Sequence, residues 1–427
     1  MSALKPVPPP SKTRLAWLDA LRGTAALWVV YQHWGARVLP AVHAVVFSVF
    51  DPGLYGVLVF FLISGYIVPA SLERTGSVRT FWIGRLFRLF PLFAVVIGLT
   101  LAMHVVGLPG LRGSEQNDTA SALSHLFMLN DLLGEPNLVV VIWTLSYEMV
   151  FYLLVTALFA ARQHRRSGGL AVTLAGAALG LGGVLPTAWL SDHTVGPTAV
   201  ALVADALVVG GLAVAVVSHG RTRAIGAWVA AGTGLVLVLV NERRFGYEGL
   251  TILALMFTGT LLYRAQHGQV SRRWAMIATA SVFGAVTAAG AWHIPALTTS
   301  TQPALQQREW IMSVVLAGLT FAAGLALQNR RVPAALAWLG LVSYSVYLVF
   351  PLLLDGYDSI PLPASYQHEA WLQVGASAVF LAALLGCAAT TYRLVEAPMQ
   401  RLGRRAAARL DRYFGPDRAA ATGAAAT

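Results

Sequence analysis

The chain has 427 residues, of which 57% are hydrophobic and only 11% are charged. A soluble domain carries about 25% charged residues, so 19 acidic and 30 basic side chains are too few to cover a water-exposed surface of this length. The composition excludes a soluble enzyme, a disordered protein and an ordinary secreted domain, and it indicates an integral membrane protein. The single cysteine, Cys387, excludes an intramolecular disulfide, a cysteine metal cluster and a CxxC redox centre.

Residues 1–14 contain three consecutive prolines and are predicted to form a flexible cytoplasmic tail. They do not resemble a cleaved signal peptide, because the apolar stretch behind them carries Asp19, Arg22 and His33.

Twelve mostly apolar stretches of about 20 residues follow, each long enough to cross a bilayer. The seventh and eighth are the weakest, because they flank the charged turn 241–244, and a re-entrant pair is the alternative there. The sequence therefore predicts an all-α, polytopic transmembrane helix bundle with 10–12 spans, forming one domain over residues 15–400. The stretches are 16–36, 53–71, 89–107, 138–161, 170–190, 198–218, 224–240, 247–264, 274–293, 309–328, 334–354 and 371–391.

The net charge is +11, and the basic residues behind it are distributed unevenly between the two ends of the predicted spans. Most lysines and arginines fall in the segments that a twelve-span arrangement places on the side of the N-terminus, which is the positive-inside pattern. Both termini are therefore predicted to be cytoplasmic, and nucleic acid is not needed as a partner to explain the charge. Residues 401–427 are expected to form a basic amphipathic tail that lies on anionic membrane lipid and whose alanine-rich end is disordered.

The first predicted span carries three polar side chains that are costly inside a membrane. Asp19 and Arg22 are three residues apart, so they can pair on one helix face. His33 follows Arg22 after about three full turns, roughly 16 Å along the axis, and is therefore expected on the same face. His33 is either a hydrogen-bonded packing residue or a functional one, and its alignment with an ion pair favours function.

Arg85 and Arg88 lie at the start of the third predicted span, on one helix face. One interpretation is that both reach to lipid phosphates as membrane anchors. The other is an anion clamp for a nucleotide diphosphate entering from the cytoplasm, because the guanidinium is a planar fork that suits phosphate.

The fourth predicted span contains Trp143, Ser146 and Glu148, with Glu148 near the membrane midplane. Its carboxylate is expected to be protonated, catalytic or paired, and a structural bridge to Arg22 is one alternative. Asp205 in the sixth span is a further intramembrane acid, without a motif around it.

Motifs of other enzyme classes are missing from the sequence: it has no GxSxG, P-loop, GxGxxG or HExxH, and its histidines lack metal-ligand spacing. No metal site is predicted. His33 is the best general base that the sequence offers.

These clusters resemble the acyltransferase-3 family of integral membrane O-acyltransferases over residues 14 to 400. Six stretches occur in the family's order, which makes the resemblance specific. They are 18–33 (like LDGLRGIAALLVVLYH), 56–66 (like GVDLFFVLSGFLI), 85–91 (an RxxR pair before an aromatic residue and proline), 143–152 (like WSLSVEEQFY), 343–348 (like ISYSLYLWH) and 392–398 (like YRLVERP).

The chain departs from the family pattern at three places. Leu58 replaces the frequent acid of the second stretch, so no role is carried over to it. Met149 replaces the second glutamate of the fourth stretch, which leaves Glu148 as its only acid, and Phe350 stands near the position of the family's late histidine.

The resemblance implies a donor, an acceptor and roles for the site residues. Acyl-CoA, with acetyl-CoA expected, serves as a co-substrate on Arg85 and Arg88, and no permanently bound cofactor is implied. His33 removes a proton from the acceptor hydroxyl, and Arg22, held by Asp19, orients the donor or stabilises the oxyanion. Ser146 and Glu148 are expected to orient His33 or the acceptor, and Trp143 to pack the acyl chain.

The acceptor is expected to be a carbohydrate, a glycolipid or a small natural product, and the location the plasma membrane of a bacterium. The acyl group is expected to pass from the cytoplasmic face toward an outer acceptor. The rival interpretation is a transporter or flippase of a lipid-linked sugar, since intramembrane charges also line transport pathways. A membrane binding or sensory protein is the third. Acyl-chain length, acceptor identity and oligomeric state remain open.

Overall fold

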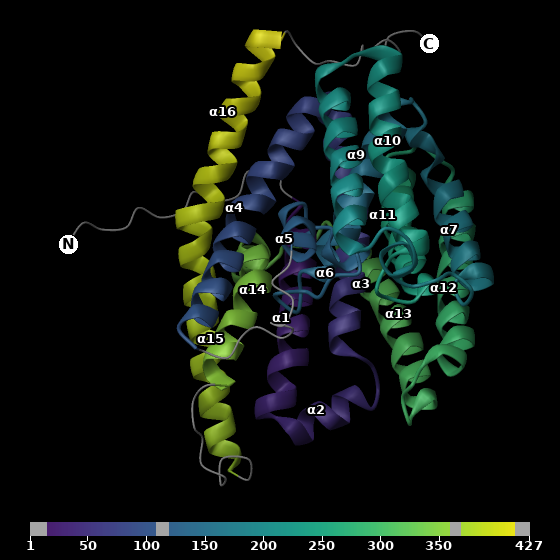
Figure 1. Cartoon of the computed structure of the whole chain (residues 1–427). Helices are drawn as coiled ribbons and strands as arrows, with labels where there is room; N and C mark the ends of the chain where they lie inside the picture. Colours follow the sequence, from purple (N-terminus) through teal and green to yellow (C-terminus); the bar gives the residue numbers. More distant parts are fainter. Residues whose placement is uncertain (1–14, 108–118, 359–368, 415–427) are drawn as a thin grey trace.

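The computed structural model describes residues 15–107, 119–358 and 369–414, and the regular elements within these ranges are all helical (Figure 1). The predicted tail 1–14 and the predicted disordered end lie outside the described residues. Of the predicted basic tail 401–427, the structure describes residues 401–414, which are helical. Short helices connect the longer ones: α2 (Pro40–Phe47), α5 (Thr119–Leu126), α8 (Trp189–His193), and the single turns η1 (Asn130–Leu132), η2 (His164–Arg166) and η4 (Tyr392–Glu396). Helix α16 (Ala397–Phe414), of 18 residues, follows η4.

A long helix coincides with each of the twelve predicted stretches. Nine helices in the described ranges are long and apolar enough to cross a membrane, and the prediction of a polytopic helical bundle is confirmed. The twelve are α1 (Ala16–Val38), α3 (Pro52–Thr75), α4 (Val78–Val105), α6 (Trp143–Ala160), α7 (Ser167–Leu181), α9 (Pro197–Val217), α10 (Gly220–Val240), α11 (Gly246–Gln266), α12 (Arg272–Leu297), α13 (Pro303–Ala326), α14 (Ala334–Asp358) and α15 (Ala370–Thr391).

Three of these twelve, α1, α7 and α11, are not among the nine. Helix α7 has only 15 residues, and α1 contains Asp19 and Arg22. Helix α11 is buried on nearly every side, so it contacts protein rather than lipid. Helices α10 and α11 each run for 21 residues and only α10 is among the nine, so the re-entrant alternative for 224–264 stays a prediction.

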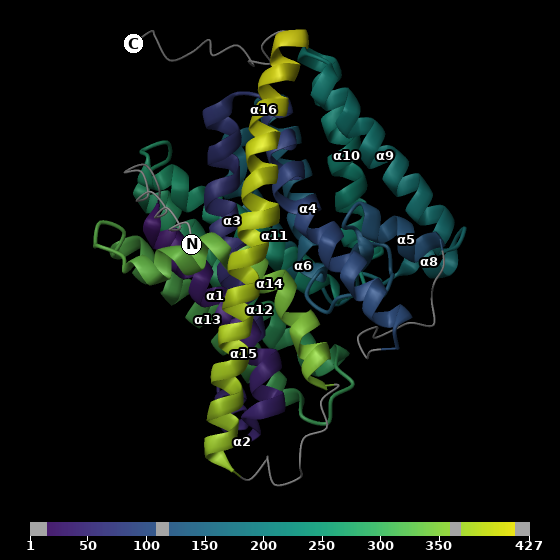
Figure 2. The same ribbon diagram turned by 90° about the vertical axis from the view of Figure 1, so that its left-hand side faces the viewer.

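Helix α6 lies in the interior of the bundle, and α12 and α13 lie at its edge. Of the most apolar window in each helix, 78% is buried in α6 but only 33% in α12 and in α13. Helices α9 and α10 form a pair that leans away from the rest of the bundle (Figure 2). Polar side chains on α1, α3, α6 and α14 are therefore held away from lipid, which lowers the cost of placing them within the membrane.

Glycines allow two pairs of interior helices to touch through their backbones. A Cβ atom added at Gly340 of α14 would lie 2.0 Å from the carbonyl oxygen of Asp19 in α1. A Cβ added at Gly65 of α3 would lie 1.8 Å from the carbonyl oxygen of Met256 in α11. Small residues at such crossings are the usual device for close packing of membrane helices.

Helices α3 and α4 form a tight hairpin with defined ends. The Asp51 carboxylate caps α3 by accepting a hydrogen bond from the Leu54 N–H at 2.9 Å, and Ser77 caps α4 through the Thr80 N–H at 3.0 Å. Gly76, at φ = 64°, makes the left-handed turn between the two helices. This hairpin brings the middle of α3 next to the arginines of α4.

Helices α15 and α16 form one long rod along the edge of the molecule, joined by the π-turn η4 (Figures 1 and 2). Helix α16 packs on α4, where Gly403 fits against the ring of Phe87. Arg79 of α4 pairs with Asp411 at 3.3 Å. The predicted basic helix within 401–427 therefore continues the last span, and its arginines 401, 404, 405, 409 and 412 stay exposed.

Candidate active site

A cavity in the middle of the bundle collects three arginines, and we call it the arginine cavity. Arg22 enters it from α1, and Arg85 and Arg88 enter it from α4. Its remaining described lining comes from α3, α4, α6 and α14: Val57, Phe60, Phe61, Ser64, Ile67, Val68, Leu89, Thr144, Leu145, Glu148, Tyr152, Ser343, Tyr344 and Tyr347. With three guanidinium groups and one carboxylate, the described lining attracts anions.

Arg85 faces the interior of the bundle. Its guanidinium carbon lies 5.1 Å from the centre of the Tyr152 ring and 5.2 Å from that of Phe81. Since Arg85 and Arg88 both line the cavity, their geometry favours the anion-clamp interpretation over that of lipid anchors.

Glu148 is the only carboxylate among the described residues that line the arginine cavity. It accepts hydrogen bonds from the Tyr152 hydroxyl and from Ser64 Oγ, the latter at 3.3 Å. Arg22 lies 4.0 Å from Asp19. In the described part of the chain Arg22 makes no ion pair with Glu148, so the bridge between these two residues is absent and both face the cavity instead.

A second cavity contains His33, and we call it the histidine cavity. It is larger than the arginine cavity, with a volume of about 480 Å³ against about 90 Å³. Its described lining is Val29, Gln32, His33, Asp51, Gly53, Leu54, Val57, Val140, Val141, Trp143, Arg244, Phe245, Tyr247, Glu248, Ile294, Thr298, Gln306, Glu309, Trp310 and Tyr347. On α1, α3 and α6 these residues lie toward the opposite helix ends from those of the arginine cavity, so the cavities occupy different depths.

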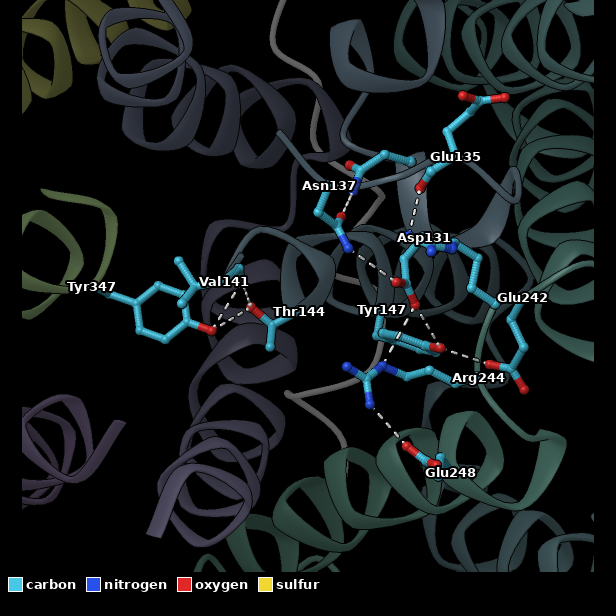
Figure 3. A network of polar contacts seen from close by, with 12 residues as sticks. Asp131, Glu135, Asn137, Val141, Thr144, Tyr147, Glu242, Arg244, Glu248 and Tyr347 are labelled. Atoms are coloured by element: carbon cyan, nitrogen blue, oxygen red, sulfur yellow. Dashed lines mark hydrogen bonds and ion pairs between the residues drawn. The ribbon is translucent and has the colours of Figure 1, made fainter. Parts of the chain in front are cut away.

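Arg244 is held at the histidine cavity by a network of polar contacts (Figure 3). Its guanidinium donates to Glu248 at 3.0 Å, lies 3.7 Å from Asp131, and covers the Trp143 ring at 3.6 Å from the ring centre. The Tyr147 hydroxyl donates to Glu242 at 2.7 Å behind it. These contacts orient one cation and one indole ring toward the cavity.

Val57 and Tyr347 line both cavities and form the wall between them. The Tyr347 hydroxyl is 2.9 Å from Thr144 Oγ1 and donates to the Val141 carbonyl at 3.0 Å (Figure 3). The ring of Phe60 packs edge-on against Tyr347, with 5.7 Å between ring centres. A narrow group that passes this wall would move from the arginines to His33.

The structure divides the predicted site residues between the two cavities. Arg22, Arg85, Arg88 and Glu148, which come from three separate clusters of the sequence, meet in the arginine cavity. His33 and Trp143 lie in the histidine cavity, so Trp143 is not beside Arg85 and Arg88 as expected. Asp19 lies behind Arg22, and Ser146, which is fully buried, lines neither cavity.

Four charged residues of the histidine cavity escaped the sequence analysis: Asp51, Arg244, Glu248 and Glu309. Each stands at or near a predicted span end, where charged residues are ordinary. The one signal in the sequence was the charged turn 241–244. In the structure Arg244 of this turn lines the histidine cavity, although the turn lies between two predicted spans.

Comparison with known proteins identifies the family of the chain. The family described as "Acyltransferase domain" matches residues 15–393. Nodulation protein 10 of Rhizobium leguminosarum bv. viciae is 32% identical over 28% of this chain and 37% of its own length. Acyltransferase MdmB of Streptomyces mycarofaciens is 31% identical over 34% of this chain and 39% of its own.

The putative peptidoglycan O-acetyltransferase YrhL of Bacillus subtilis is 27% identical over 32% of this chain and 22% of its own length. The chain thus spans well under half the length of these relatives. No solved structure matches the chain. Because the family match covers most of the sequence, the chain belongs to the acyltransferase-3 family of integral membrane acyltransferases.

Proposed function

We propose that this membrane O-acyltransferase moves an acyl group, with acetyl expected, from acyl-CoA in the arginine cavity to a hydroxyl of a carbohydrate-bearing acceptor in the histidine cavity. The observation that carries the proposal is the pair of cavities that meet at Val57 and Tyr347. One supplies fixed positive charge and the other supplies a histidine.

The arginine cavity suits the donor because coenzyme A carries phosphates. Arg85 and Arg88 offer two planar forks for phosphate oxygens, and each fork can donate two parallel hydrogen bonds. Arg22, which lies next to Asp19, is the third cation of this cavity and adds to its attraction for the anionic donor.

The histidine cavity suits a sugar because it combines aromatic walls with polar groups. Trp310 and Tyr247 meet edge to face with 5.2 Å between ring centres, and amide, hydroxyl and carboxylate groups surround them. The name of the Bacillus subtilis relative refers to peptidoglycan, a carbohydrate polymer, which supports the same class of acceptor here.

The proposed reaction is one displacement at the thioester carbonyl. The acceptor hydroxyl oxygen attacks the carbonyl carbon while His33 takes the hydroxyl proton. Arg22, about three helical turns from His33 on α1, orients the anionic donor within the arginine cavity. The carbon–sulfur bond then breaks, and the proton passes from His33 to the leaving thiolate.

The proposed orientation places the arginine cavity toward the cytoplasm of a bacterial cell. The helix ends on its side carry basic residues, including Arg74, Arg79 and Arg221, as the positive-inside rule requires of cytoplasmic segments. Acyl-CoA would then enter from inside, and the acceptor would bind on the outer side. Both termini would be cytoplasmic.

Thiol release by the detergent-purified chain tests the function. Wild type and His33→Ala are mixed with acetyl-CoA or longer acyl-CoAs, and a host extract supplies acceptors. We expect release in the wild type and its loss in the variant, with acetyl-CoA binding unchanged. Full release by His33→Ala would exclude the proposed base, and no release with any donor would favour a transporter or flippase.

Cysteine labelling tests the orientation, because Cys387 is the only natural cysteine. In a Cys387→Ala background, Ser48→Cys and Thr75→Cys each introduce one exposed thiol at opposite ends of α3. An impermeant maleimide added to intact cells is expected to label position 48 and not position 75. Labelling of position 75 alone would reverse the orientation.

A further inference from the structure

The histidine cavity carries more negative than positive charge. Asp51, Glu248 and Glu309 line it together with one arginine, Arg244, among the described residues. Arg244 is already paired with Glu248 at 3.0 Å and lies 3.7 Å from Asp131, which does not line the cavity. The carboxylates of Glu309 and of Asp51, which also accepts the hydrogen bond that caps α3, therefore line the cavity in excess of its own cation.

Glu309 is the acid that most needs a partner. It is only 6% exposed, and its Oε1 atom has no hydrogen-bond partner among the described residues. Its neighbour Arg308 is exposed to the outside of the bundle. A buried carboxylate is costly unless a cation or a hydrogen-bond donor faces it, so this arrangement is suited to a group that a ligand supplies.

Asp51 lies at the same corner of the cavity as Glu309. The backbone N–H of Asp51 donates to Ser313 Oγ at 3.2 Å, and Ser313 Oγ donates back to the Asp51 carbonyl at 3.1 Å. Ser313 is one turn beyond Glu309 on α13, so the two acids come from helices that are pinned together there. The start of α3 also packs on α1, where a Cβ at Gly53 would lie 2.9 Å from Gln32 Cγ, next to His33.

The aromatic wall beside these acids is rigid. Trp310 donates through its indole N–H to the Val286 carbonyl at 2.9 Å, and its ring packs edge-on against Tyr247. Arg244 already covers the Trp143 ring, so a second cation is directed toward Trp310 and Tyr247 rather than Trp143. Aromatic faces next to carboxylates are a common environment for a bound ammonium group.

We infer that the histidine cavity binds an acceptor bearing a protonated amino group, such as an amino sugar, with the ammonium against Glu309 and Asp51 and a hydroxyl toward His33. This inference rests on the proposed function and names its acceptor class. It also accounts for the choice of oxygen over nitrogen: an ammonium held by carboxylates has no lone pair, so only the hydroxyl attacks the thioester. The proton goes from that hydroxyl to His33, and the thiolate leaves.

The affinities of the wild type for two disaccharides with the same β-1,4-linked skeleton test the inference without any variant. One is the β-1,4-linked dimer of glucosamine, and the other is its di-N-acetylated form, which carries no charge. Binding of each to the full chain in lipid nanodiscs is measured by calorimetry slightly below neutral pH. We expect the diamine to bind about tenfold more tightly, since a hydrogen bond to a charged group contributes on this scale.

Three variants locate the preference within the cavity. Glu309→Gln keeps the shape of the side chain and removes its charge, and Asp51→Asn retains a residue that caps α3. Each is expected to reduce the preference for the diamine to within about threefold. Asp192→Asn, an exposed residue of α8 with the same change in charge, is the matched control and is expected to keep the full preference.

The results separate this inference from the proposed function. Equal binding of the two sugars by the wild type, binding of neither, or a full preference in Glu309→Gln would overturn the amino-acceptor site. Thiol release from acetyl-CoA is measured in parallel. If thiol is released but the diamine is not preferred, acyl transfer is supported and the amino-acceptor site is wrong. If the diamine is preferred but no donor gives thiol release, the amino-acceptor site is supported and acyl transfer is wrong.

Discussion

The two cavities differ in charge although they share a wall. The arginine cavity has three arginines and one carboxylate in its described lining, and the histidine cavity has three carboxylates and one arginine. One environment attracts an anionic donor and the other attracts a cationic or hydroxyl-rich acceptor. The contrast shows how one bundle can keep two substrates apart until a thioester and a hydroxyl meet at Val57 and Tyr347.

The largest expected effect comes from His33, because it is the only histidine in the described lining of either cavity. His33→Ala is expected to reduce kcat about 100-fold to 10,000-fold, the range of a lost general base, with little change in the KM for acetyl-CoA. Steady-state thiol release measures both constants. A variant that instead raises this KM tenfold would place His33 with the donor and break the division between the cavities.

Arg88 is expected to show the opposite pattern. Arg88→Ala should raise the KM for acetyl-CoA about tenfold to 100-fold, since a charge-assisted contact to phosphate is lost, while kcat changes less. Arg221→Ala, which removes an exposed basic residue at the start of α10, is the control with the same change in charge. If the two variants raised the KM equally, Arg88 would act only through the overall positive charge of the protein, and the arginine cavity would not be the binding site of the donor.

Val57 tests the wall between the cavities. Val57→Ala enlarges the passage beside Tyr347 and is expected to raise the ratio of kcat/KM for butyryl-CoA over acetyl-CoA about tenfold, which is the scale of discrimination by one or two methylene groups. Val68→Ala, which lines only the arginine cavity about three turns away on α3, is the control. An unchanged ratio in Val57→Ala would mean that the acyl group does not cross at this wall.

The smallest expected effect concerns the network behind Arg244. Burial, together with nearby Glu248 and Asp131, raises the pKa of the Glu242 carboxyl well above its usual range. The folded protein therefore holds this proton more tightly than the unfolded chain does, so the contribution of Glu242 to stability is complete below the ordinary glutamate pKa and is lost as pH rises through the raised pKa. Glu242→Gln, which keeps an acceptor for Tyr147, should make Tm depend less on pH.

Thermal unfolding of the purified protein at a series of pH values measures this change. Glu135→Gln is the control, because the Glu135 carbonyl accepts a hydrogen bond from Arg243, whereas the Tyr147 hydroxyl donates to Asp131 and Glu242 (Figure 3). If Tm of Glu242→Gln fell with pH as steeply as that of the wild type, the proton would belong to another group.

The spans and their order could be read from the sequence because a bilayer demands about 20 apolar residues for each crossing. The same physics marked Arg22, Arg85, Arg88 and Glu148, since charges inside a membrane are costly and need a reason. Helical periodicity also placed Arg22 and His33 on the interior face of α1, and both line cavities there.

Only the tertiary structure decided which of these residues share a cavity. Trp143 and Glu148 are five positions apart and were grouped as one motif, yet Tyr347 of α14 crosses at this level and separates them. The missed acids show the same limit: Asp51 and Glu309 meet because Ser313 pins α13 to the start of α3. The sequence by itself determined the membrane fold, the family and the costly charges, because each depends on local composition and spacing. The division into a basic and an acidic cavity depends on contacts between helices distant in the chain, which local composition does not encode.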